Sequence, residues 1–110
     1  MRESITAVVA RGDTWSGVAA SEPYDVAWAS EAVIFLRSLG AEGNPEQARA
    51  WVQISPDGMR WVDEGSLLPI PRPDEISSVR ISNFGTYLRV MTVLPEGASF
   101  KALLTISLKE

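Results

Sequence analysis

The segment Ser99–Leu108 restricts the fold more than any other part of the chain. One set of alternate positions is apolar throughout: Phe100, Ala102, Leu104, Ile106 and Leu108. The positions between them are mostly polar: Lys101, Leu103, Thr105, Ser107 and Lys109. Successive side chains of a β-strand point to opposite faces. This period of two therefore predicts a strand with one buried face and one mostly solvated face, as in an antiparallel sheet.

Other strand-like segments follow one another along the chain and are separated by turn residues. They are Ser4–Ala10, Val26–Ser30, Glu31–Leu39, Ala48–Ser55, Met59–Asp63, Ser77–Ser82 and Thr86–Leu94. The segment Glu31–Leu39 also suits a short helix, but Val33, Ile34 and Phe35 are typical of strands. The proline-rich stretch Glu64–Arg72 fits only an edge strand or an extended connection.

This succession of short strands, with turns roughly every 8–12 residues, predicts an all-β fold. We expect an antiparallel β-sandwich, jelly-roll-like, of about seven to eight short strands. A chain of 110 residues has the length of one domain, so residues 1–110 are predicted to form a single β-sandwich domain. We also expect a polar turn at Arg11–Gly17, and one helical turn after Asn44 and Pro45, with Asn44 as its cap.

Charge and residue types exclude several classes of function. The net charge is −4 and the sequence has no run of Lys or Arg, so neither nucleic acid nor a membrane surface is an expected partner. The chain has no Cys and no His, which removes thiolate nucleophiles, imidazole bases and the common zinc sites. We therefore expect no metal site, no cofactor and no enzymatic activity.

The start of the sequence predicts no export by a signal peptide. Its apolar run, Ile5–Ala10, is shorter than a secretory signal requires, and Glu3 precedes it. No stretch approaches the length of a transmembrane helix. We expect the protein in the cytoplasm or as part of a particle.

The segment Ser55–Gly58 (SPDG) predicts a tight hairpin between two strands. Pro56 and Asp57 suit the central positions of a type I turn, and Gly58 suits the following positive φ. Such a three-residue loop closes with a G1 bulge and fixes the register of the flanking strands. The expected opposite pairs are Ser55 with Met59, Gln53 with Trp61, and Trp51 with Asp63.

This register predicts one core face and one contact face. The core face holds Ala50, Val52 and Ile54. The opposite face carries the candidate ligand or partner contacts: Trp51, Gln53, Met59, Trp61 and Asp63. Trp51 and Trp61 are expected to be diagonal neighbours on it. Three coverings remain open for this face: the protein itself, a second copy, or a ligand.

The same region resembles a known family. The residues Ser55, Asp57, Gly58 and Trp61, followed by the run Tyr87–Val90, resemble the discoidin-type (coagulation factor 5/8 C-terminal) β-sandwich over Gln53–Val90. The chain lacks the paired cysteines of that family. The resemblance implies a jelly-roll-like sandwich with a binding role and identifies no ligand.

These features predict three functions, in order of preference. The first is a non-catalytic assembly or interaction module, such as a structural subunit of a phage or bacterial particle, with a homo-oligomer or a protein partner. Its grounds are the apolar residues on both faces of Thr86–Leu94 and the proline-rich segment Leu67–Pro73. The alternative is a carbohydrate-binding module, in which Trp15 or Trp28 extends the aromatic face and a glycan is the partner. The third is a small enzyme of unknown type.

Overall fold

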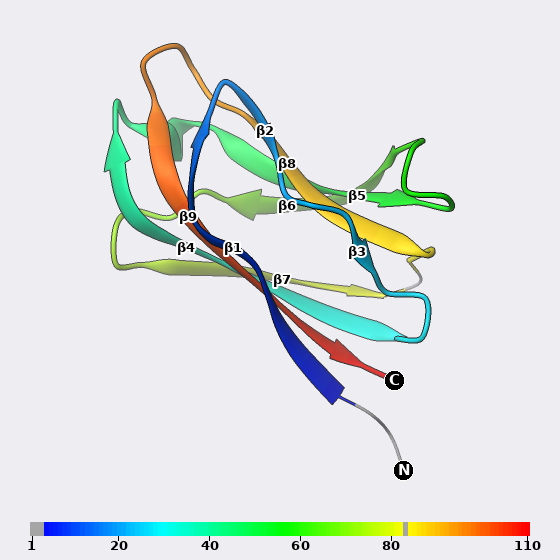
Figure 1. Ribbon diagram of the computed structural model, residues 1–110. Helices are drawn as coiled ribbons and strands as arrows, with labels where there is room; N and C mark the ends of the chain where they lie inside the picture. The colour runs from blue at the N-terminus through cyan, green and yellow to red at the C-terminus, as the bar shows by residue number, and fades with distance from the viewer. Residues whose placement is uncertain (1–3, 83) are drawn as a thin grey trace.

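The computed structural model describes residues 4–82 and 84–110, and in this part the chain forms nine strands and one 3-10 turn (Figure 1). In chain order these are β1 (Ser4–Ser16), β2 (Val18–Ala20), β3 (Tyr24–Asp25), β4 (Glu31–Glu42), η1 (Pro45–Gln47), β5 (Arg49–Ser55), β6 (Val62–Pro69), β7 (Ile76–Ser82), β8 (Tyr87–Val93) and β9 (Ser99–Lys109). The strands build two antiparallel sheets packed face to face, so the predicted all-β sandwich is confirmed.

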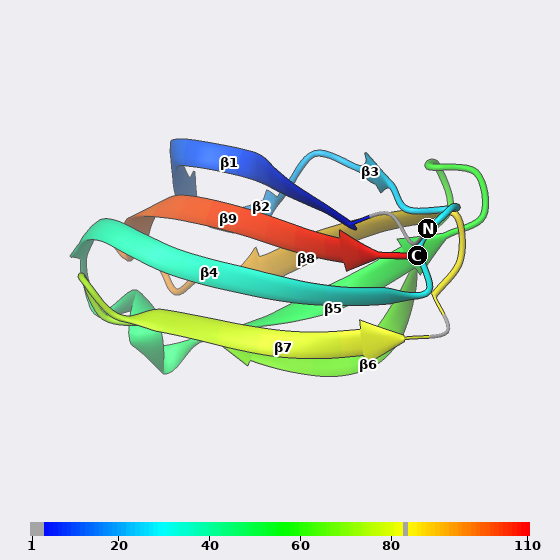
Figure 2. The same ribbon diagram turned by 90° about the horizontal axis from the view of Figure 1, so that it is seen from below.

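The order of the strands in the two sheets is that of a jelly roll. The first sheet has the order β1-β9-β4-β7, and Figure 2 shows these four strands side by side with the other sheet behind them. The second sheet has the order β2-β8-β5-β6, and β3 also pairs with β8. Most connections cross from one sheet to the other, as in the Greek keys of a jelly roll, whereas β5 and β6 are paired neighbours within the second sheet. β8, which carries apolar residues on both faces, lies inside its sheet between β2 and β5.

The core lies between the two sheets and follows the alternation of β9. All five apolar positions named for this strand are at most 1% exposed. Across the core they face the second sheet, where Val52, Leu88 and Val90 are fully buried. Trp15 closes one end, with its ring edge-to-face on Phe100 at a centroid distance of 5.6 Å. Each buried Leu, Ile or Val contributes about 1.5–3 kcal/mol through removal of its apolar surface from water.

Several strands are longer than predicted. β1, β4 and β9 have 13, 12 and 11 residues, and the predicted turn at Arg11–Gly17 is wrong because β1 continues beside β9 as far as Ser16. A bulge between Arg11 and Asp13 takes up the polar residues without breaking the pairing. β4 likewise continues past Gly40 through a bulge between Ser38 and Ala41.

The predicted strand Val26–Ser30 is wrong, because this segment is a turn. The Asp25 carboxylate accepts a hydrogen bond from the backbone N–H of Ala27 at 3.0 Å. The N–H of Ala29 then bonds to the carbonyl of Val26, also at 3.0 Å. These bonds compete with a sheet ladder and close the chain locally.

Two further predictions concern the connections. The helical turn after Asn44 is present as η1, but Asn44 makes no capping side-chain bond and has a left-handed φ of 58°. The proline-rich segment is an edge, as expected, because β6 ends at Pro69 on the outside of the second sheet. In the described ranges, no helix is long and apolar enough to cross a membrane.

The sandwich depends on a close approach between the end of β4 and the turn before β9. Gly43 has a φ of 69°, and a Cβ atom there would fall on the carbonyl of Gly97. We expect Gly43→Ala to lower the free energy of unfolding through both the left-handed backbone, at about 1–2 kcal/mol, and the overlap, at about 1–3 kcal/mol. Urea denaturation followed by tryptophan fluorescence measures this loss.

Gly17→Ala is the matched control for this substitution. Gly17 also has a positive φ, 57°, but nothing lies within 4 Å of the position of its Cβ. We expect the control to lose only the backbone contribution. Equal losses for the two variants would show that the contact between Gly43 and Gly97 does not restrict the fold.

Candidate functional site

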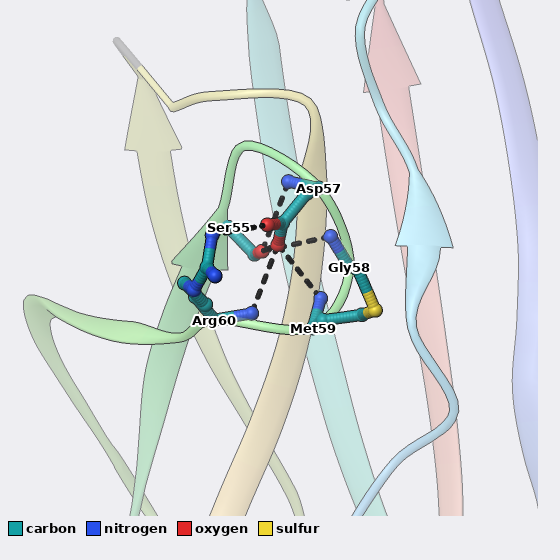
Figure 3. A network of polar contacts seen from close by, with 5 residues as sticks. All are labelled: Ser55, Asp57, Gly58, Met59 and Arg60. Atoms are coloured by element: carbon teal, nitrogen blue, oxygen red, sulfur yellow. Dashed lines mark hydrogen bonds and ion pairs between the residues drawn. The ribbon is translucent and has the colours of Figure 1, made fainter.

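The loop between β5 and β6 is built by side-chain hydrogen bonds rather than by a tight backbone turn. β5 ends at Ser55 and β6 begins at Val62, so residues 56–61 form the connection. The Ser55 hydroxyl accepts bonds from the N–H groups of Asp57 at 3.2 Å and Gly58 at 2.8 Å. The Asp57 carboxylate accepts from the N–H groups of Met59 at 2.8 Å and Arg60 at 2.9 Å (Figure 3). Such Asx and Ser turns fold the loop back on itself.

The longer loop moves the register by two residues. Gln53 lies opposite Asp63, not opposite Trp61, so the predicted three-residue hairpin is wrong, although Gly58 has the expected positive φ of 79°. A shift of two keeps every side chain on its predicted face. A bulge then places Trp51 opposite Leu67 rather than Asp63. The core positions Ala50 and Val52 are fully buried, as expected.

A polar row crosses the outer face of the second sheet over three strands. Gln53 on β5 pairs with Arg89 on β8 on one side and with Asp63 on β6 on the other. Its amide donates through Nε2 to the Asp63 carboxylate at 3.0 Å and accepts through Oε1 from Arg89 Nε at 2.8 Å. The row therefore joins a carboxylate to a guanidinium through one amide.

Arg89 also covers the ring of Trp61. The guanidinium carbon lies 4.2 Å from the ring centroid, which is the geometry of a cation–π contact. Burial lowers the pKa of Arg89 from its ordinary value. Because one face of Trp61 is covered in this way, the ring does not present a bare platform on both sides. Arg89 is absent from the contact residues predicted from the sequence, although the alternation of β8 places it on the same face as Met91.

Trp51 belongs to a second, apolar row on the same face. It pairs with Met91 on β8 and Leu67 on β6, and Met91 pairs with Ala20 on β2. We call Ala20, Met91, Trp51 and Leu67, together with the pair Val18 and Val93, the apolar band. Leu67, Val93 and Val18 are 56%, 52% and 72% exposed. Trp51 is half-buried, and its indole N–H has no hydrogen-bond partner within residues 4–82 and 84–110.

The remaining candidate residues do not join this surface. Met59 lies in the loop, not on a strand, and is 79% exposed. Trp15 is buried against Phe100 in the core, so the idea that it extends an aromatic platform is wrong. Trp28 is half-buried and packs against the core as well.

A hollow on the first sheet lies apart from the apolar band, and the carboxylates of the described residues form no metal-binding cluster. One hollow of 480 Å³ lies on the first sheet, away from the apolar band, and is lined in part by Glu31, Arg80 and Lys109. The described residues contain no group of three or more carboxylates that could hold a metal ion. The outer face of the second sheet thus combines the apolar band with a row of aromatic, amide and guanidinium groups.

Known proteins resemble the chain in fold alone. No protein-family model matches it, and no curated protein matches it in sequence. The SPBc2 prophage-derived protein YomS has a similar structure, with a TM-score of 0.62 and 7% identity, over 100% of this chain and 96% of that protein. The infectious bursal disease virus Gx strain structure is similar at a TM-score of 0.48 and 11% identity, over 98% of this chain and 32% of that one. The likeness to YomS supports the β-sandwich fold, and neither named structure is described as a discoidin-type domain.

The Asp57 loop gives the site a pH dependence with a defined sign. Backbone hydrogen bonds from Arg60 and then Met59 hold the pKa of Asp57 below its usual value of 3.8. A carboxyl whose pKa is depressed by folding stabilises the fold above its unfolded pKa and loses that contribution as the pH falls through the folded pKa. An NMR titration of Asp57 is expected to give a midpoint below 3.8.

Two substitutions separate charge from hydrogen bonding in this loop. Asp57→Asn keeps an acceptor oxygen for the N–H groups of Met59 and Arg60, whereas Asp57→Ala removes it. We expect the alanine variant to be less stable than the asparagine variant at pH 7, and the loop amides to exchange faster. An Asp57 midpoint at or above the usual value would contradict this account of the loop.

Proposed function

We propose that the protein is a non-catalytic β-sandwich module that works by assembly with protein subunits, first of all with copies of itself. The single observation that carries the proposal is the apolar band on the outer face of the second sheet, where Val18, Leu67 and Val93 are more than half exposed. Contiguous exposed apolar surface on a soluble domain is typical of a contact site.

The centre of the band has the character of an interface core. The row from Ala20 through Met91 and Trp51 to Leu67 crosses four strands without a charged side chain. Trp51 stands half-buried in its middle, and tryptophan is enriched among the residues that dominate binding energy. Covering exposed Val and Leu side chains yields about 25 cal/mol per Å² of apolar surface removed from water.

The first sheet offers a less suitable surface. Its outer face also exposes apolar residues, among them Ile76 at 63% and Leu39 at 47%. Along β9, however, this face carries Lys101 and Lys109, and charged residues are depleted at interface cores. On the second sheet Arg89 and Asp63 lie beside the apolar band and not within it, so the band is the preferred contact surface.

The edge of the second sheet favours face-to-face packing over strand addition. β6 is one edge strand of this sheet, and Pro69 at its end has no N–H to donate to a further strand. Two copies related by a two-fold axis can bring the same face of each together, which is the commonest arrangement in homo-oligomers. A second copy can therefore cover the apolar band without any other component.

The fold supports placing such a module in a phage or bacterial particle. YomS, which shares the fold along nearly its whole length, is a prophage-derived protein. Jelly rolls recur in capsid domains and in lectins, so the fold itself does not choose between assembly and sugar binding. In this proposal the protein acts in the cytoplasm or as part of the particle.

The surface gives less support to carbohydrate binding. A sugar platform needs an open aromatic ring and free polar neighbours, but Arg89 covers one face of Trp61, and Gln53 is bonded to both Arg89 and Asp63. No specific observation favours a small enzyme. The discoidin resemblance agrees with a binding role in general terms and adds no ligand.

The mass of the purified protein tests the proposal. We expect light scattering at tens of micromolar to give a mass above the 12.0 kDa of one chain. Leu67→Lys places a charge in the apolar band and is expected to return the mass to that of the monomer, because burial of an unpaired charge is costly.

Ile76→Lys is the matched control. Ile76 is exposed to a similar degree and lies on an edge strand, but on the first sheet, so its substitution adds the same charge and should leave the mass unchanged. A monomeric parent protein would contradict the proposal. If Ile76→Lys dissociates the assembly and Leu67→Lys does not, the contact lies on the first sheet, which also contradicts the proposal.

A further inference from the structure

Arg89 is a positioned cation whose terminal nitrogens have no partner in the described part of the chain. Its Nε donates to Gln53, and its guanidinium plane lies over Trp61, so two contacts fix its orientation. Among residues 4–82 and 84–110, the one ion pair joins Arg60 to Asp57. The two Nη groups of Arg89 thus keep their donor capacity for something else.

The neighbouring carboxylates do not fill this role. Asp63 belongs to the same polar row but lies two strands away from Arg89, roughly 10 Å at the usual strand spacing. Gln53 occupies the strand between them and takes a bond from each side, which fixes both groups in place. Glu22 follows Ser21, which is bonded to the backbone of Val90, but Glu22 is exposed and forms no ion pair with Arg89.

The site is also partly withdrawn from water. Arg89 is half-buried, and this burial lowers the pKa of its guanidinium. It stays charged at neutral pH, because an arginine is not deprotonated in proteins. A partly desolvated charge without a counter-ion costs free energy that an incoming anion recovers.

We propose that Arg89, stacked on Trp61 and held by Gln53, is a binding site for a carboxylate group supplied by a neighbouring copy of the chain. The planar guanidinium presents parallel N–H donors that match the two oxygens of a carboxylate. The source rests on the proposed function, since it requires self-association. The chain has 14 acidic residues against 10 basic ones, so a second copy brings carboxylates in excess.

The position of Arg89 fits this role in an assembly. On β8 it stands on the same face as Met91, in the row next to the apolar band. A carboxylate bound there would lie at the border of the covered surface, where the ion pair is shielded from solvent. The band would then supply most of the contact energy, and Arg89 would set the orientation of the second copy.

The first experiment measures self-association by analytical ultracentrifugation. Arg89→Gln is expected to raise the dissociation constant of the dimer at least about tenfold, because it removes a charged hydrogen-bond partner. Arg80→Gln is the matched control: Arg80 is an exposed arginine on β7 of the first sheet, and its loss should leave the dissociation constant unchanged. An Arg89→Gln protein that associates as tightly as the parent overturns the proposal.

The second experiment tests the site apart from assembly. The Leu67→Lys protein is titrated with sodium acetate, and with sodium chloride at equal ionic strength, while NMR follows Arg89 Nε–H and the Trp61 indole N–H. We expect saturable shifts of both signals with acetate only, and none in the Leu67→Lys, Arg89→Gln double variant. Equal shifts with chloride, or no shift with acetate, overturn the carboxylate site.

The two experiments separate the two proposals. If the parent protein is monomeric but acetate still shifts the Arg89 and Trp61 signals, the proposed assembly fails and the second copy is excluded as the source, while the carboxylate site stands. If the parent associates and acetate has no effect on the Leu67→Lys protein, the assembly stands and the carboxylate site is excluded.

Discussion

The packing of the two inner sheet faces is the constraint on which the rest of the structure depends. Leu88 and Val90 on β8, and Leu104 and Ile106 on β9, are fully buried between the sheets. Because successive side chains of a strand point to opposite faces, burial of these residues forces their neighbours outward. Arg89 and Met91 lie on the outer face of the second sheet for this reason. The surface proposed for assembly is thus a consequence of the core.

The sequence patterns predicted the parts of this arrangement that depend on alternation. The period of two in Ser99–Leu108 predicted the buried face of β9 correctly, and the same logic put Trp51, Gln53 and Asp63 on one face. The predicted face of each of these residues is correct although the predicted register is wrong, because the register differs by two residues. The face to which a side chain points depends only on its position along its own strand. It can therefore be predicted from the sequence without knowing which strand lies alongside.

The parts that could not be predicted depend on side-chain bonds and on non-local pairing. The SPDG segment suits a tight turn by its backbone preferences, but the Ser55 hydroxyl and the Asp57 carboxylate bind loop N–H groups and lengthen the connection. The bulge that brings Leu67 beside Trp51 contains Gly65, with a φ of 112°. A glycine inside a strand is a signal for a bulge, but it does not specify how the pairing shifts. Arg89 meets Gln53 only because β8 lies next to β5, which hydrophobic patterning along one chain does not specify.

The outer face of the second sheet unites the functional proposals. The apolar band supplies non-directional contact surface, and the row of Arg89, Gln53 and Asp63 beside it supplies directional polar groups. Interfaces commonly combine an apolar core with a polar rim in this way. The fold shared with YomS leaves the partner to be set by the surface.

Solvent exposure of methyl groups at low and high protein concentration tests the central claim most directly. A soluble paramagnetic agent enhances the NMR relaxation of methyl groups that contact water. If copies assemble through the second sheet, this enhancement falls with increasing protein concentration at Val18, Leu67 and Val93, and stays constant at Leu39 and Ile76 on the first sheet. Enhancements that do not change with concentration, or that fall at Leu39 and Ile76 instead, would contradict assembly through the second sheet.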